Sequence, residues 1–291
     1  MNLEDRLDFV PITQRPRLQL PNGGRVAVWV IVNVEHWRST HPMPRTVLPP
    51  PMGEPLRPDL PNWAWHEYGM RVGFWRFHEL LARLQIKATL AINGKVCSSY
   101  PAVASAAHDA GWEFIGHGFF QGPMHRVENQ REAIAQTIDA IRNTTGAAPR
   151  GWESPGLTET DDTLDLLAEA GIEYVADWVL DDQPVRLRTK HGPILSVPYS
   201  VEINDIAIVA LQQHEARVFA ERGQAQFDQL YKEGEQSARV MAISVHPYIM
   251  GVPHRIAALE KLLTYVASHD QVNWMTGGEI ADWFNHQQPL T

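Results

Sequence analysis

The sequence is poor in cysteine and in clustered positive charge, and it contains no long hydrophobic run. Its single cysteine, Cys97, excludes an internal disulfide framework and a metal site built from thiolates. No apolar segment reaches the roughly 18 residues of a membrane helix, and residues 1–20 lack the apolar core of a signal peptide. We therefore expect a cytoplasmic protein that has no membrane as a partner.

The charge balance excludes a further class of partner. The chain has 25 Lys and Arg against 34 Asp and Glu, a net charge of −9, and its basic residues are scattered singly. Such a surface repels phosphate backbones, so nucleic acid is not an expected partner. The 44% hydrophobic residues are typical of a folded globular protein, and 291 residues fit one α/β barrel.

Strand and helix patterns alternate from residue 25 onward. Residues 1–24 read as an N-terminal arm that ends in an Asn-Gly-Gly turn. Strands are expected at 25–34, 87–92, 113–116, 151–154, 172–177, 193–198, 240–246 and 272–275. Helices are expected at 72–84, 102–111, 127–143, 160–171, 214–233, 255–269 and from about 277. Repeated βα units predict a parallel sheet, open or closed into a barrel, within one domain of residues 25–291.

A proline-rich segment at 41–66 interrupts this alternation after the first strand. Its prolines break helices and strand ladders alike, and a loop of this length inside a domain is usually functional. Trp63 and Trp65 lie at its end, where they could belong to the core or stack on a planar ligand. We interpret the segment as a lid over the binding site.

Polar and aromatic side chains gather where the predicted strands end. In parallel α/β folds the carboxyl ends of the strands carry the chemistry. Carboxylates and imidazoles that meet there suit acid–base hydrolysis or a metal site. A structural role, as a helix cap or a core histidine, is the alternative for each. The candidates are Asn33, Glu35, His117, Gln121, His125, Trp152, Glu153, Trp178 and His246.

The residues at these strand ends, taken in the order of the chain, resemble the motifs of the polysaccharide deacetylase (NodB-homology) family. The matching stretches are Asn33-x-Glu35, GHGFFQ, RGWESPG, ADW and a late SVHP, spread from about residue 25 to 286. The resemblance implies a deformed (β/α) barrel. Three longer stretches are most similar to the branch of metal-independent allantoinases and cyclic imide hydrolases: EYGMRVGFWR, YVADWVLDDQPV and HPYIMGVPHRIAAL. Resemblance to that branch implies that the protein is a homo-oligomer.

The family motifs are only partly kept. The first motif of the family has a base aspartate and a metal-ligating aspartate, and Asn33 and Glu35 stand in these places. The second motif has two histidines four residues apart, here His117 and Gln121. The third has an arginine that orients the base, matched by Glu153, and the late histidine that acts as general acid matches His246.

The altered motifs favour chemistry without a metal. If a metal is bound, the resemblance assigns Glu35, His117 and Gln121 as its ligands, with His125 as a further nitrogen. Gln is a poor zinc ligand because its amide oxygen is neutral and hard. Without a metal, an acetamide is difficult to hydrolyse, whereas an imide or ureide carbonyl is more electrophilic. We therefore expect no cofactor, with zinc or another divalent ion as the alternative.

The leading hypothesis is a hydrolase that opens a small cyclic imide or ureide. Glu35 or Glu153 would accept a proton from water, and His117 or His246 would protonate the departing nitrogen. Binding would fall to Asn33, Gln121, Arg71, His125 and the indoles of Trp63, Trp65, Trp152 and Trp178. The alternatives are a metal-dependent polysaccharide N-deacetylase and a non-catalytic barrel that binds a ligand.

Overall fold

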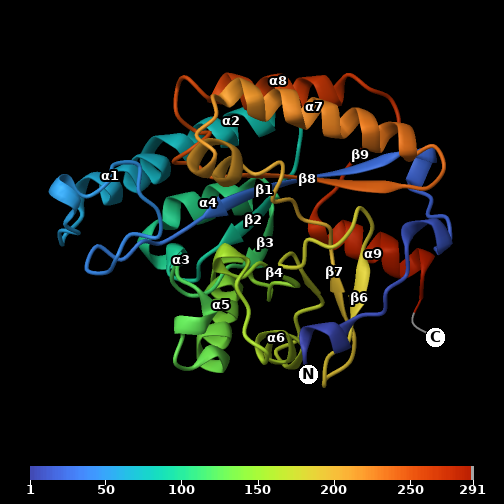
Figure 1. Ribbon diagram of the computed structural model, residues 1–291, viewed down its shortest axis with the longest axis horizontal. Coiled ribbons are helices and arrows are strands. Elements are labelled where there is room, and N and C mark those ends of the chain that lie inside the picture. The colour runs from blue at the N-terminus through green and yellow to red at the C-terminus, as the bar shows by residue number, and fades with distance from the viewer. Residues whose placement is uncertain (290–291) are drawn as a thin grey trace.

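The computed structural model describes residues 1–289, in which nine strands form one curled sheet flanked by helices (Figure 1). The strands are β1 (Val26–Val34), β2 (Thr89–Ile92), β3 (Glu113–Gly116), β4 (Gly151–Trp152), β5 (Tyr174–Val175), β6 (Val185–Leu187), β7 (Ile194–Ser196), β8 (Arg239–Val245) and β9 (Val272–Trp274). Their order is β6-β7-β5-β4-β3-β2-β1-β8, and β9 pairs with β1. All pairs are parallel except β6 with β7. This arrangement is the deformed, single-domain barrel that the sequence predicts.

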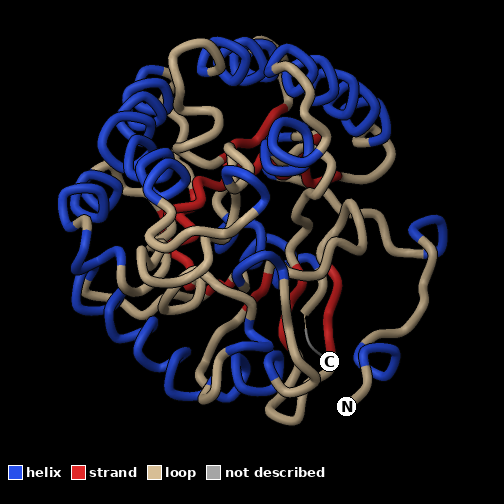
Figure 2. Tube along the Cα trace, turned by 60° about the vertical axis from the view of Figure 1, so that its left-hand side comes forward, coloured by secondary structure: helices blue, strands red, loops and turns tan. Residues whose placement is uncertain are grey.

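Helices flank the sheet, most of them on its convex side. They are α1 (Leu60–Tyr68), α2 (Phe74–Arg83), α3 (Val96–Ser99), α4 (Pro101–Asp109), α5 (Gln130–Thr145), α6 (Thr163–Glu169), α7 (Ala216–Glu233), α8 (Ile256–Ala267) and α9 (Gly277–Gln287). Figure 2 shows most of them as a partial ring outside the strands, whereas α9 packs on the core inside the barrel through Ile280, Ala281 and Trp283. None of the helices within residues 1–289 combines the length and the apolar character needed to cross a membrane.

Strand β1 shows how the sequence places the site. All nine of its residues are buried, as expected for a strand covered on both faces. The even-numbered valines from Val26 to Val34 pack in the core beneath the helices. Ala27, Trp29 and Ile31 belong to the core inside the barrel. Because side chains alternate along a strand, Asn33 and the following Glu35 continue this inward face at the carboxyl end.

The sheet does not close by strand pairing between its edges, β6 and β8. Two irregular segments fill this seam instead. The backbone N–H of Val240 donates to the carbonyl of Asp182 at 2.8 Å, and that of Ser244 donates to Ile203 at 3.1 Å. The second segment leads into a π-helix, Ile206–Leu211. Sequence periodicity predicted neither this π-helix nor β6.

Residues 1–24, predicted as an N-terminal arm, pack against their own domain. The carbonyl of Arg6 accepts the N–H of Arg188 beside β6 at 2.7 Å, and that of Leu18 accepts the N–H of Ala238 at 2.9 Å. The Arg6 side chain is 1% exposed and forms a 3.2 Å ion pair with Asp165 of α6. The segment therefore straps the seam between the two edges of the sheet.

The segment predicted as a lid is a loop only in its first part. Leu60–Tyr68 forms α1, whose N-cap Asp59 accepts a hydrogen bond from the backbone of Asn62. Pro61 lies in the first turn, where a missing N–H costs nothing. The proline-rich pattern at 41–59 therefore correctly indicates irregular chain, and the predicted loop extends too far. Whether this segment acts as a lid stays a prediction.

Candidate active site

A cavity of about 220 Å³ opens at the carboxyl ends of the strands. One side of it is polar and carries the candidate acid–base groups. The other side is formed mainly by apolar residues of the loop after β4 and of the connection from β7 to α7. The lining residues are Glu35, Arg45, His117, Gln121, Glu153, Gly156, Leu157, Tyr199, Val201, Asn204, Ile206, Ala207, Leu211 and His246.

Glu35 is held as a carboxylate at the end of β1. Its Oε2 accepts hydrogen bonds from the indole of Trp37 at 2.5 Å and the hydroxyl of Tyr248 at 3.2 Å. Its Oε1 accepts from Nε2 of Gln121 at 2.9 Å. Burial alone would raise the pKa of Glu35, but nearby His246 and His117 lower it below the ordinary value. Glu35 is therefore an ionised, fully hydrogen-bonded group and a weak base.

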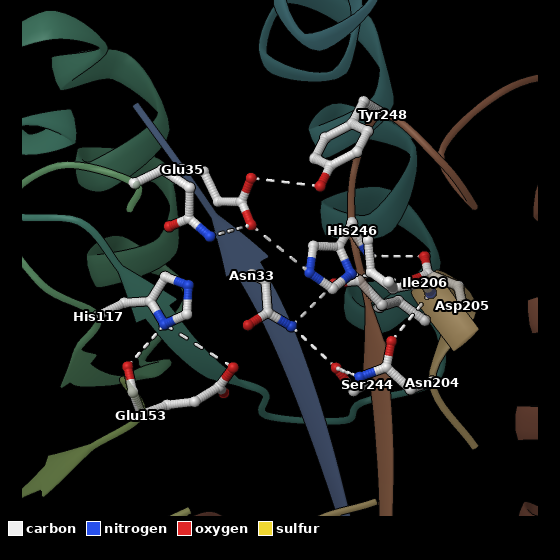
Figure 3. A network of polar contacts seen from close by, with 12 residues as sticks. Asn33, Glu35, His117, Glu153, Asn204, Asp205, Ile206, Ser244, His246 and Tyr248 are labelled. Carbon is white, nitrogen blue, oxygen red and sulfur yellow. Dashed lines mark hydrogen bonds and ion pairs between the residues drawn. The ribbon is translucent and has the colours of Figure 1, made fainter. Parts of the chain in front are cut away.

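His246 follows β8 and is oriented by Asp205 (Figure 3). Asp205 is fully buried; its Oδ2 accepts the backbone N–H of His246 and its Oδ1 accepts from Nδ1, both at 2.7 Å. Since a carboxylate only accepts, the proton of the imidazole sits on Nδ1. Nε2 then faces the cavity, 3.7 Å from Oε1 of Glu35. This geometry equips His246 to exchange a proton with a bound molecule.

His117 and Glu153 lie on the opposite side of Asn33 in Figure 3. Nδ1 of His117 donates to the backbone carbonyl of Glu153 at 2.7 Å, which leaves Nε2 as an acceptor. Burial lowers the pKa of His117 to about 4 despite the nearby carboxylate of Glu35. His117 is therefore neutral at neutral pH, and its Nε2 can accept a hydrogen bond from a ligand.

The carboxyl of Glu153 differs sharply from that of Glu35. Burial and the neighbouring Asp177 raise the pKa of Glu153 well above its ordinary value, which favours the protonated form of this carboxyl. Its Oε1 accepts from the hydroxyl of Tyr199 at 3.2 Å. Two carboxyl groups with pKa values moved in opposite directions are typical of acid–base sites.

Three buried polar atoms at the site have no hydrogen-bond partner among the described residues. They are Oε2 of Glu153, Nε2 of His117 and Oδ1 of Asn33. The amide nitrogen of Asn33 is occupied, because it donates to Ser244 at 2.9 Å. Buried polar atoms are normally paired, so these three atoms are available to form hydrogen bonds with a polar molecule in the cavity.

The structure brings together part of the residue set expected from the sequence. Glu35, His117, Gln121, Glu153 and His246 line the cavity, and Asn33 is buried directly beneath them. The other predicted binding residues, all within the described chain, lie outside the cavity lining: Trp63, Trp65, Arg71, His125, Trp152 and Trp178.

Local structure explains these exceptions. Trp152 and Glu153 are adjacent at β4, so their side chains point to opposite faces, and Trp152 is fully buried in the outer core. Trp65 packs on the rings of Trp37 and Tyr248 from helix α1, and Trp63 also packs against the core.

The remaining three are polar or hydrogen-bonded elsewhere. The side chain of Arg71 is 75% exposed and pairs with Glu67, and His125 is exposed on a short 3₁₀ turn. The indole of Trp178 donates to Glu159 at 2.9 Å.

Sequence reasoning missed Asp205, Tyr199, Asn204 and Arg45. Asp205 begins the π-helix, and π-turns often mark functional sites, but no residue pattern announces one here. Tyr199 and Asn204 lie beyond β7 in irregular chain, where strand-end reasoning stops. Arg45 lies in the proline-rich segment, whose path the sequence does not define. An acidic residue beside a buried apolar run was the only available signal for Asp205.

The residues assigned to a possible metal do not fit a divalent cation. Gln121 turns its amide N–H toward Glu35, and its Oε1 accepts from Asn93 at 3.3 Å. An N–H group cannot ligate a cation, and both carboxylate oxygens of Glu35 already accept hydrogen bonds. Across residues 1–289, no group of three or more His, Cys, Asp or Glu is arranged to hold a metal ion.

Several known proteins are similar to this chain in sequence and fold. The family model "Polysaccharide deacetylase" matches residues 66–175. A curated "Putative polysaccharide deacetylase" from Schizosaccharomyces pombe is 28% identical over 77% of this chain and 76% of its own length. A "Probable Polysaccharide deacetylase" structure from Pseudomonas aeruginosa PAO1 is 27% identical with a TM-score of 0.85, covering 96% of this chain and 97% of that one. In both sequence and fold, the chain is therefore similar to proteins of the polysaccharide deacetylase (NodB-homology) family.

Other proteins that are similar to this chain carry different names. A "Peptidoglycan deacetylase" from Helicobacter pylori is 23% identical over 75% of this chain and 85% of its own length. The structure of a PuuE allantoinase is 26% identical with a TM-score of 0.85, covering 95% of this chain and 96% of that one. Proteins named as deacetylases and as an allantoinase thus share the fold of this chain, and both names denote hydrolases that act on carbon–nitrogen bonds.

The lowered pKa of His117 makes stability depend on pH. Its pKa falls from 6.5 unfolded to about 4 folded, so the unfolded chain binds the extra proton first. The stabilisation is complete above pH 6.5 and is lost as pH falls toward 4. We expect the urea midpoint to drop between pH 7 and pH 5, and to drop less in His117→Asn. An equal drop in the urea midpoints of wild type and His117→Asn would contradict this expectation. The matched control is His108→Asn, which changes an exposed histidine and should behave as wild type.

Proposed function

We propose that the protein hydrolyses a ring carbon–nitrogen bond of a small cyclic imide or ureide without using a metal. The observation that carries this proposal is the hydrogen bond from Gln121 to Glu35, 2.9 Å long. It places an N–H donor where the family resemblance calls for a metal ligand. The site offers acid–base groups and hydrogen-bond donors, and these suffice for a substrate whose carbonyl is already activated.

The size of the cavity supports a small ring. Its volume of about 220 Å³ lies below the roughly 300–1,000 Å³ of pockets that hold drug-sized ligands. A five- or six-membered ring with a short substituent fits this space, whereas an oligosaccharide chain needs a groove. Leu157 and Ile206 belong to the apolar side of the cavity, where they form a hydrophobic surface on which the ring can pack.

The reaction follows from the positions of the acid–base groups. Nε2 of His246 takes a proton from a water molecule, whose oxygen bonds to a ring carbonyl carbon. Asp205 stabilises the imidazolium and keeps it oriented, and the carboxylate of Glu35 adds a second negative charge 3.7 Å away. The ring C–N bond then breaks, and His246 returns the proton to the departing nitrogen. The new acid ionises and releases the second proton of the water.

Glu153 and His117 supply the remaining interactions. In its protonated form, which the raised pKa of Glu153 favours, this residue donates a hydrogen bond from its unpartnered Oε2 to the carbonyl oxygen as negative charge develops there. Nε2 of His117 accepts a hydrogen bond from a ring N–H. The two groups together orient a molecule in which a carbonyl and an N–H are adjacent, as in imides and ureides whose ring nitrogen carries no substituent.

The proposed partner is a small molecule, and we also propose a homo-oligomer. Apolar side chains are exposed along one short stretch of the proline-rich segment, which supports a protein–protein contact there. These are Val47, Leu48, Met52, Leu56 and Leu60.

The first test is activity on allantoin, hydantoin and succinimide, measured before and after chelation together with the metal content of the protein. We expect ring opening by protein without stoichiometric metal, unchanged by the chelator. Stoichiometric zinc together with activity on N-acetylated oligosaccharides that the chelator abolishes would favour the metal-dependent deacetylase instead. A ligand bound without turnover would favour the non-catalytic barrel.

Amide variants of the two carboxyl residues separate their roles. Glu153→Gln keeps a hydrogen-bond donor, so we expect a fall in kcat of only about tenfold. Glu35→Gln loses the charge that faces His246 and should lower kcat by about 100-fold. The measurement is kcat on the best ring substrate at pH 7. Full activity in both variants would refute the proposed site.

A further inference from the structure

Arg45 is a cation at the cavity with no protein partner in the described part of the chain. It is half-buried and lines the cavity together with Glu35, His117 and Gln121. Other arginines of the protein with similar or lower exposure have acceptors: Arg6 pairs with Asp165, and Arg76 donates to Gly251. The guanidinium of Arg45 therefore retains its donors for a ligand.

The backbone that carries Arg45 is fixed in position. The side chain of Asn62, which is 2% exposed, accepts the N–H groups of Val47 and Leu48 at 2.7 and 3.1 Å. Its amide nitrogen donates to the carbonyl of Leu48 at 3.0 Å. These bonds hold the chain immediately after Arg45 against helix α1, so the arginine is presented at one place on the cavity rim.

Charge around the cavity determines what Arg45 can bind. Its positive charge acts on Glu35, His117 and Tyr248, which places it on their side of the site. Within the described residues Arg45 forms no hydrogen bond with Glu35, whose oxygens accept from Trp37, Tyr248 and Gln121. A planar guanidinium binds a carboxylate through two parallel hydrogen bonds.

We propose that Arg45 binds a carboxylate of the ligand at the cavity rim. This inference rests on the proposed ring-opening function for the origin of that carboxylate. Two sources exist: a carboxylate substituent on the ring, or the carboxylate that forms when water adds to the ring carbonyl and the C–N bond breaks. In the second case Arg45 is a product-binding residue and offsets the repulsion between the new carboxylate and Glu35.

The binding arm of the test does not require turnover. Succinamate, the product of succinimide hydrolysis, is compared with neutral succinamide by calorimetry on wild type, Arg45→Gln and Arg45→Lys. We expect wild type to bind succinamate at least tenfold more tightly than succinamide, Arg45→Lys to keep part of this preference, and Arg45→Gln to lose it. The control Arg57→Gln removes a charge from an exposed position of the same segment and should match wild type.

The kinetic arm distinguishes the two sources. If a substituent is bound, wild type shows a KM at least tenfold lower for hydantoin-5-acetate than for hydantoin, and Arg45→Gln abolishes this difference. If the product is bound, KM values stay unchanged and inhibition by succinamate weakens about tenfold in Arg45→Gln. Equal binding of succinamate and succinamide by wild type, or the same preference in Arg45→Gln, overturns the proposal. Wild type that opens no ring refutes the function, while the binding arm still tests Arg45.

Discussion

Replacing Asp205 with asparagine is expected to lower kcat by about 10³–10⁴-fold with little change in the fold. The amide oxygen of the variant can still accept the backbone N–H of His246, as Oδ2 does now at 2.7 Å. The amide NH₂ group then faces Nδ1 of the imidazole, so the proton of the ring moves to Nε2. An imidazole protonated at Nε2 cannot accept a proton from water.

Steady-state kinetics and circular dichroism at pH 7 check this expectation. Asp270→Asn, an exposed change of the same kind, is the matched control and should retain wild-type kcat. His246→Gln should lose as much activity as Asp205→Asn, because both variants lack the same base. A loss below tenfold in a folded Asp205→Asn protein would assign the proton transfer to another group.

Replacing Arg6 with methionine should lower the free energy of unfolding by about 3 kcal/mol, because it removes one partner of a buried ion pair. Asp165, with a side chain 6% exposed, then keeps only Lys190, whose ammonium lies 3.2 Å away and is 56% exposed. Despite burial, Arg6 and Lys190 hold the pKa of Asp165 below its ordinary value, so this stabilisation is present above about pH 4 and is lost as pH falls further.

Urea unfolding at pH 7 measures the effect of Arg6→Met. Arg17→Met changes an exposed arginine of the same segment and should alter the unfolding free energy by less than about 0.5 kcal/mol. If Arg6→Met matched this control, the N-terminal segment would contribute nothing to the stability of the domain.

Much of the site could be predicted from the sequence, because its residues lie at the ends of strands and because successive side chains of a strand point to opposite faces. Val34 ends β1, His117 follows β3, and Glu153 and His246 directly follow β4 and β8. Parallel strands bring such positions to one edge of a sheet. Alternation also would have excluded Trp152 once Glu153 was placed in the cavity, since neighbours on a strand face opposite sides.

The remaining site residues lie in irregular segments, where no sequence periodicity predicts the direction in which a side chain points. Asp205 reaches His246 across 41 positions in the sequence, from the turn of a π-helix that composition does not reveal. Arg45 is presented by hydrogen bonds that Asn62 makes with the following backbone. Trp63 and Trp65 follow a proline-rich stretch, and only the N-cap at Asp59 shows that a helix has begun before them.

The N-terminal segment, residues 1–24, bridges the two edges of the sheet, and this affects the order in which the chain folds. Arg6 and Leu18 find their partners at Asp165 and Ala238, so residues that leave the ribosome early wait until most of the domain has been made. Contacts over such separations form slowly. Because β8 carries His246 at its end, we expect the proposed catalytic base and the contact between Leu18 and Ala238 to form in the same late step of folding.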